Sequence, residues 1–153
     1  MPEVKTKVIS KVGFTMVFLM ALLQAVYAIY AYIDPQAFAL VRGTELFNAS
    51  DSDWVNIYAS RTVFVALIIG YLLFLGEYKI LVWAALFGTV MPVTDAWLAL
   101  QAGAENPVIY KHIATIIYLL ATSLVLKLMI KDEKQQCLKT LSSSSTYHPR
   151  GHA

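Results

Sequence analysis

Four long apolar stretches constrain this chain more than any other feature of its sequence. A helix needs roughly 20 apolar residues to cross the hydrocarbon core of a bilayer. The four stretches of that length are 12–33, 54–75, 80–100 and 108–130. Only 14% of the 153 residues are charged, whereas soluble domains contain about 25%. The sequence therefore predicts an all-α integral membrane protein, a four-helix bundle of antiparallel up-and-down spans over 12–130.

Two of the three links between these stretches are short. The link 76–79 is a tight turn, so the second and third stretches are expected to form an antiparallel hairpin. The link 101–107 contains Gly103 and Pro107, which both stop helices. Neighbouring spans must therefore lie side by side with opposite directions.

The first link, 34–53, is longer and contains a helix of its own. Asp34 followed by Pro35 is a typical helix start, and Gly43 is a typical stop. We expect a short helix on the surface of the bundle. Its apolar residues would touch the membrane interface; they are Phe38, Leu40 and Val41.

Basic residues indicate the orientation. If the spans alternate in direction, most lysines fall on one side of the membrane; these are Lys5, Lys7, Lys11, Lys79, Lys127, Lys131, Lys134 and Lys139. The excess of lysine and arginine in cytoplasmic loops then places both termini in the cytoplasm. Residues 1–11 would form a cytoplasmic N-terminus. Residues 131–153 would form a cytoplasmic tail, which is serine-rich from Ser142 and expected to be disordered.

The membrane depends on the host. A multi-pass protein of this kind is expected in the plasma membrane or the endoplasmic reticulum. Asn48 begins an Asn-Ala-Ser sequon in the outward-facing loop, which can be glycosylated only in a eukaryotic host.

Two ionisable residues of opposite sign lie inside the apolar stretches. Arg61 is seven residues from the outer end of the second stretch, on the order of 10 Å deep, and Asp95 is roughly 8 Å deep in the third. A charge at this depth is costly unless it is paired or hydrated. Pro92 should kink the third helix just below Asp95. Two explanations are equally weighted: Arg61 and Asp95 form a structural ion pair, or they perform chemistry.

Other polar residues share this outer layer. His112 lies about 6 Å inside the fourth stretch, where it could be a catalytic residue or a plain interfacial histidine. Candidate substrate-binding residues are Gln24, Tyr27, Tyr58, Thr94 and Trp97. Their aromatic members could instead belong to a belt at the interface. The inner half of the bundle has few polar residues.

Several classes of function are disfavoured. A net charge of +2 is too small to indicate nucleic-acid binding, and the single cysteine, Cys137, permits no internal disulfide. No His, Cys, Asp or Glu cluster has metal-ligand spacing, and no phosphate-binding or nucleophile motif occurs. We therefore expect no metal and no cofactor.

The motifs resemble those of a known family. They are Ser60-Arg61-Thr62, Gly76-Glu77-Tyr78-Lys79, Met91-Pro92-Val93-Thr94-Asp95-Ala96 and a histidine entering the last span. On these motifs, residues 14–129 resemble a family of small four-helix membrane proteins of bacteria and fungi, DoxX-like in architecture and known as a domain of unknown function. An arginine on the second helix and Pro-x-x-Asp on the third recur in that family, and Arg61, Pro92 and Asp95 match them. His112 matches the family's histidine. The resemblance implies the fold and little about activity.

Two hypotheses follow. The first is an intramembrane isomerase, cyclase or hydrolase of a membrane lipid or another lipophilic small molecule, with Asp95 as general acid or base, Arg61 as its positioning or oxyanion-binding partner and His112 as a proton relay. The second is a non-catalytic subunit or scaffold, a homo-oligomer or the partner of another membrane protein, in which Arg61 and Asp95 form a structural pair. A minimal transporter is disfavoured because no polar residue marks an inner pathway.

Overall fold

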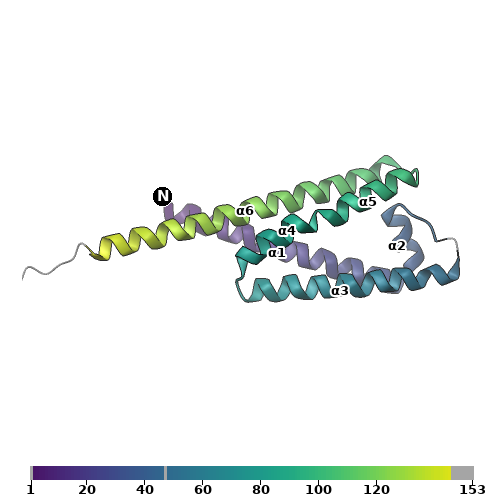
Figure 1. Cartoon of the computed structure of the whole chain (residues 1–153), viewed down its shortest axis with the longest axis horizontal. Coiled ribbons are helices and arrows are strands. Elements are labelled where there is room, and N and C mark those ends of the chain that lie inside the picture. Colours follow the sequence, from purple (N-terminus) through teal and green to yellow (C-terminus); the bar gives the residue numbers. More distant parts are fainter. Residues whose placement is uncertain (1, 47, 146–153) are drawn as a thin grey trace, which may run out of the picture.

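The structure is a computed structural model that describes residues 2–46 and 48–145, and it contains only helices and connecting turns over these residues (Figure 1). Four segments are long and apolar enough to cross a membrane: Lys7–Ile33, Ser52–Phe74, Tyr78–Gln101 and Asn106–Lys139. The prediction of an all-α, four-span membrane protein is confirmed. Residues 146–153 of the expected tail lie outside the described residues.

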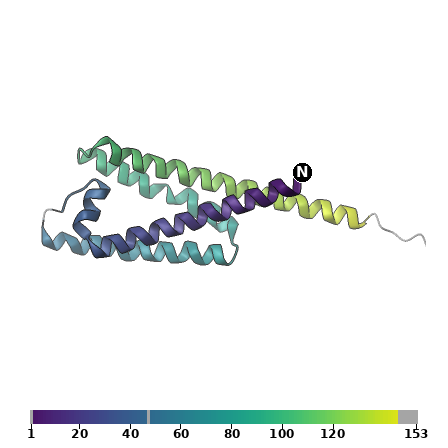
Figure 2. The same ribbon diagram turned by 180° about the vertical axis from the view of Figure 1, so that it is seen from behind.

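The elements in chain order are α1 (Pro2–Ile33), α2 (Pro35–Arg42), a 3₁₀ turn (Ala49–Asp51), α3 (Ser52–Phe74), α4 (Tyr78–Gly88), α5 (Val90–Gln101) and α6 (Asn106–Ser145). Helix α1 packs along α3, and α4 and α5 pack along α6. These two halves meet where the α3–α4 turn lies and diverge toward the opposite end, where α2 fits between them (Figures 1 and 2). We call this the α2 end of the bundle.

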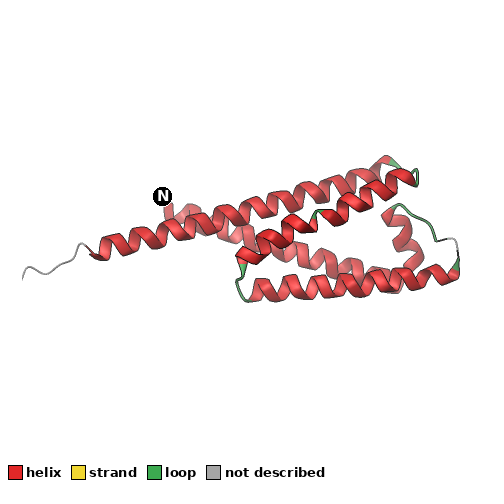
Figure 3. Cartoon of the chain, viewed as in Figure 1, coloured by secondary structure: helices red, strands yellow, loops and turns green. Residues whose placement is uncertain are grey.

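The third span is broken where proline chemistry requires it. Helix α4 ends at Gly88 and α5 begins at Val90, with Thr89 between them (Figure 3). Pro92 has no N–H for the carbonyl of Gly88, four residues earlier, and its ring crowds that carbonyl. The hydroxyl of Thr89 instead donates to the carbonyl of Leu86 at 2.7 Å. Pro92 was predicted to kink the third helix just below Asp95, and the structure divides this span at Thr89, three residues before Pro92.

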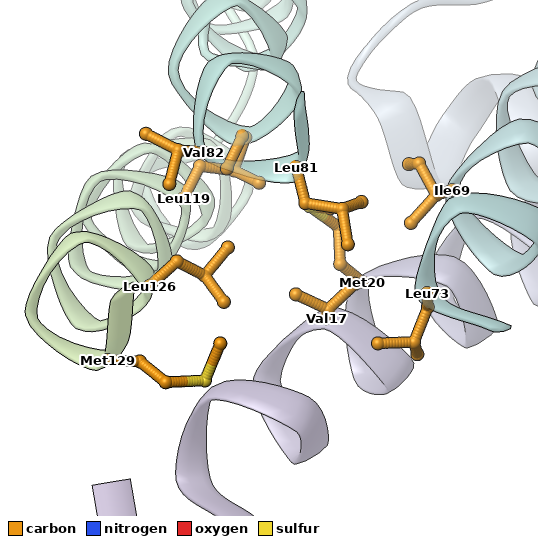
Figure 4. Close-up of a cluster of buried hydrophobic side chains, with 10 residues drawn as sticks. Val17, Met20, Ile69, Leu73, Leu81, Val82, Leu119, Leu126 and Met129 are labelled. Carbon is orange, nitrogen blue, oxygen red and sulfur yellow. The ribbon is translucent and has the colours of Figure 1, made fainter. Parts of the chain in front are cut away.

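A cluster of buried apolar side chains joins the halves away from the α2 end (Figure 4). Val17, Leu81, Leu126 and Met129 are fully buried in it. Gly13 allows α1 to approach α6 closely here, because a Cβ at this position would lie 3.3 Å from Leu126 Cδ2. Close approach at this point and divergence beyond it leave room at the α2 end.

Helix α2 has the predicted ends but a different environment. The Asp34 carboxylate accepts from the Ala37 N–H at 2.9 Å, and Gly43 adopts a left-handed φ of 86° that lets the chain leave the helix. The expectation that Phe38 touches the membrane interface is wrong, because its side chain is only 3% exposed. Its ring packs against Tyr27, Tyr30 and Tyr58 with centroids 5.5–6.1 Å apart. Only Leu40 and Val41, of the three expected residues, are exposed.

Helix α6 extends well beyond the span. It continues to Ser145, so residues 131–145 are helical and not an unstructured tail. Glu, Lys, Gln and Leu, which dominate 131–139, are strong helix formers, and the preceding span supplies the helical nucleus that a separate segment would need.

Candidate functional site

The centre of the polar layer is an ion pair between Arg42 of α2 and Asp95 of α5. The guanidinium Nη2 donates to the Asp95 carboxylate. The two side chains are only 15% and 22% exposed, so water screens the pair weakly. The expected pairing of Asp95 with Arg61 is wrong.

Arg61 is exposed on the outside of α3. The buried stripe of α3 contains Ala59, Thr62, Ile69 and Leu73, and Arg61 lies about 100° around the helix from Thr62. Tyr58 and Arg61 are three residues apart, but Tyr58 is at one edge of the stripe and Arg61 lies outside it. Spacing along the helix therefore suggested a common face that the packing does not use.

Aromatic rings surround the Arg42 side chain. Its guanidinium carbon lies 5.4 Å from the ring centroid of Tyr58, 5.8 Å from that of Tyr27 and 6.0 Å from that of Phe38. Ring faces attract a cation within about 6 Å. The rings and Asp95 together stabilise a positive charge that a bilayer would otherwise oppose.

Two further contacts hold the C-terminal end of α2 against the rest of the bundle. Lys111 of α6 donates through Nζ to the carbonyl of Val41. A lysine in this position satisfies a free carbonyl and complements the negative end of the helix dipole. A Cβ at Gly43 would lie 2.9 Å from Val108 Cγ1 and 3.1 Å from the Cβ atoms of Ala99 and Ala104. The chain can make this turn only because glycine has no side chain.

His112 lies next to the pair and is almost completely buried, with 3% of its surface exposed. One ring nitrogen, Nε2, is buried without a hydrogen-bond partner among the described residues. An unsatisfied buried acceptor or donor costs about 1–3 kcal/mol, so Nε2 is positioned for a group that the protein itself does not provide.

A small cavity adjoins these groups. Its free volume is about 40 Å³, space for roughly three water molecules. Side chains of α1, α2, α3, α5 and α6 line it together with the end of α4. The residues are Met20, Leu23, Gln24, Tyr27, Arg42, Tyr58, Gly88, Met91, Pro92, Asp95, His112, Thr115, Tyr118 and Leu119.

The cavity brings together five of the eight predicted site residues: Asp95, His112, Gln24, Tyr27 and Tyr58. The other three lie on exposed surfaces, and none of them lines it. Thr94 donates its hydroxyl to the carbonyl of Val90 on its own helix at 2.9 Å. Trp97 is 62% exposed, as expected for a member of an interfacial belt. Arg61 is the third.

Sequence reasoning missed Arg42 as a site residue. The sequence does predict the helix that positions Arg42. Asp34 and Pro35 mark its start and Gly43 its C-cap, so Arg42 lies in its last turn. A helix of eight residues is too short to be stable alone, so it needed packing partners. The hydroxyl of Tyr118, also missed as a site residue, donates to the Met16 carbonyl at 2.5 Å and links α6 to α1.

A second, open groove adjoins the ion pair on the other side, between α2, α3 and α5. Arg42, Tyr58 and Asp95 line both this groove and the cavity, and its rim includes the carboxylates of Glu45 and Asp51. The pair thus separates the cavity from a second groove whose rim includes two carboxylates. Over the described residues, no three His, Cys, Asp or Glu side chains come together as metal ligands.

Comparisons with known proteins place the chain in a family. No curated protein and no solved structure matches it. The family model described as "Domain of unknown function (DUF4267)" matches residues 21–126, a range that includes every residue lining the cavity except Met20. Since the match covers more than half of the chain, the protein is a membrane-spanning member of this DUF4267 family.

Proposed function

We propose that the protein is a cofactor-independent membrane enzyme that transfers protons within a lipophilic substrate whose polar end occupies the cavity. The observation that carries the proposal is the unpartnered Nε2 of the buried His112. Histidine is the commonest general acid or base because its ordinary pKa is close to neutral pH. A histidine that only filled space in the core would be expected to have both nitrogens satisfied.

The surrounding groups have separate tasks in this proposal. His112 accepts a proton from the substrate and returns it at a second position, which isomerises the substrate without gain or loss of atoms. Arg42 stabilises the negative charge that develops on a substrate oxygen. Asp95 holds Arg42 in place, so it acts as a fixed counter-ion and not as the acid or base. A cyclisation or hydrolysis at the same site would use His112 in the same way.

Deuterium incorporation tests this reaction. The full chain in lipid nanodiscs is incubated in D₂O with an apolar extract of the source organism, and the extract is surveyed by mass spectrometry. We expect one class of molecule to change and to incorporate deuterium on carbon. His112→Gln should slow the change by about 10²–10⁴-fold, the usual contribution of a general acid or base. Arg61→Gln, on the exposed face of α3, serves as the matched control and should behave as wild type.

The second candidate is a non-catalytic membrane subunit in which the polar contacts are structural. Three contacts favour it, because Arg42 to Asp95, Lys111 to Val41 and the close packing at Gly43 all hold α2 in the bundle. If no molecule in the extract changes or incorporates deuterium, the enzyme proposal fails. Co-purification of a stoichiometric membrane partner, equal for wild type and His112→Gln, would then support the subunit.

A further inference from the structure

A groove between α1 and α6 provides a route from the bilayer to the cavity. The two helices are in close contact near Gly13 and diverge toward the α2 end (Figure 2). The groove lies in the diverging part, within the membrane-spanning segments of both helices. Its lining is mostly aliphatic and aromatic and comprises Leu19, Leu22, Leu23, Val26, Tyr27, Lys111, Ala114, Thr115 and Tyr118. Such a surface suits a hydrocarbon chain.

The groove and the cavity are separated by a wall only one side chain thick. Leu23, Tyr27, Thr115 and Tyr118 line both spaces. The Tyr118 hydroxyl donates a hydrogen bond to the Met16 carbonyl. This bond fixes the part of the wall that Tyr118 forms. Leu23 has no hydrogen bond to hold it, so rotation of the Leu23 side chain would join the two spaces.

The protonation of His112 selects the polar group that can bind beside it. In the neutral imidazole with its ring proton on Nδ1, only Nε2 can accept a hydrogen bond. Nε2 then presents a lone pair and requires a donor from the occupant of the cavity. An O–H group supplies that donor, whereas an ether or an ester oxygen does not.

The size of the cavity further limits which polar groups can bind beside His112. A free volume of about 40 Å³ accepts groups on the scale of a few water molecules. A hydroxyl group fits, but a phosphate with its substituents does not. The polar end must therefore be small and able to donate a hydrogen bond.

We propose that the site takes a lipophilic alcohol from the bilayer, with its hydroxyl donating to His112 Nε2 and its hydrocarbon chain lying in the groove between α1 and α6. This inference rests on the site of the proposed function and names its substrate class. It requires only binding, so it can be tested without turnover.

The imidazole nitrogen resonances of His112 report this binding directly. The chain contains only three histidines, so ¹⁵N-histidine labelling gives three imidazoles, and the spectrum of His112→Gln identifies the one at the site. The probes are 1-tetradecanol and its methyl ether in nanodiscs. We expect the alcohol to shift the Nε2 resonance of His112 toward that of a hydrogen-bonded acceptor. The methyl ether should bind about tenfold more weakly and leave the resonance in place.

Two matched substitutions test the route. Ala114→Trp fills the groove and should weaken the effect of the alcohol about tenfold or more. Val93→Trp adds a tryptophan on an exposed position of α5 that lines neither space and should leave the titration unchanged. Equal responses to alcohol and ether, a proton on Nε2, or a titration insensitive to Ala114→Trp would each overturn the proposal. A binding result of the expected kind with no deuterium incorporation would instead refute only the enzyme.

Discussion

Arg42 and Asp95 form an ion pair that joins the short helix α2 to the third membrane span. The pair converts α2 from a surface element into a wedge between the two halves of the bundle, with Phe38 and Arg42 directed inward. The polar site is therefore assembled by a segment that does not cross the membrane. Its geometry depends on how firmly α2 is held.

Removing either charge should destabilise the protein. Asp95→Asn leaves Arg42 without a counter-ion, and Arg42→Gln leaves Asp95 without one. Because the pair is partly exposed, we expect a loss of about 2–3 kcal/mol, between the values for surface and fully buried pairs. The double variant should lose less than the sum of the two single losses. Reversible unfolding in mixed micelles measures all three.

Arg61→Gln is the control for the ion pair. It removes a charge from the same outer layer but from an exposed side chain, so its effect should be within about 0.5 kcal/mol. A loss from Arg61→Gln that equals the loss from Asp95→Asn, with the effects of the two non-additive, would show that Arg61 is the true partner.

Gly43→Ala should destabilise the protein more than Gly103→Ala. Both glycines have positive φ, 86° and 68°, so alanine costs about 1 kcal/mol of backbone strain at either position. Only at Gly43 does the new Cβ meet a neighbour, 2.9 Å from Val108 Cγ1, whereas the space at Gly103 is open. The difference between the two melting temperatures isolates the clash. Equal losses would mean that α2 can move away from α6 freely.

The sequence was sufficient for the fold because its signals are local or depend on length. Apolar runs of about 20 residues predict spans, and Asp34 and Gly43 predict the ends of α2. Pro92 predicts a kink just below Asp95, close to the division of the span at Thr89. The ion pair could not be predicted in this way. In a bilayer all faces of a span can be apolar, so the sequence does not mark which face of α3 is buried. Arg42 falls in the link 34–53 outside the predicted spans, so depth alone favoured Arg61 as the partner of Asp95.

Tyr118→Phe should weaken the contact between α6 and α1. The substitution removes the hydroxyl that donates to the Met16 carbonyl at 2.5 Å while keeping the ring, and we expect a loss of about 1 kcal/mol. Tyr110→Phe removes a hydroxyl from an exposed tyrosine of the same helix and should cost nothing measurable. Both are measured by the same unfolding assay, and equal costs for the two would contradict the tether.

Lys111→Met should loosen the end of α2 without unfolding the bundle. The methionine keeps most of the aliphatic stem but cannot donate to the Val41 carbonyl. Amide hydrogen exchange in 38–44 should then become faster, by about three- to tenfold for the loss of about 1 kcal/mol. Lys127→Met removes a cation that lies over the Trp83 ring, 5.7 Å from its centroid, in the other half of α6. It should leave exchange in α2 unchanged, and a general increase in both variants would refute a local role for Lys111.

The single cysteine makes the orientation directly measurable. Cys137 is exposed on the extension of α6, and the lysine distribution predicts that this extension is cytoplasmic. A membrane-impermeant maleimide should therefore label Cys137 only after the plasma membrane is permeabilised.

A relocated thiol provides the matched control for this orientation. In the double variant Cys137→Ser with Ser50→Cys, the thiol moves to the loop beside α2, where Ser50 is exposed. This variant should be labelled in intact cells if the protein is in the plasma membrane, and should stay protected after selective permeabilisation if it is in the endoplasmic reticulum. If intact cells label the wild-type thiol on α6 but not the relocated thiol in the loop, the orientation is reversed. The His112 cavity would then lie in the cytoplasmic half of the bilayer, and its alcohol would enter from the inner leaflet.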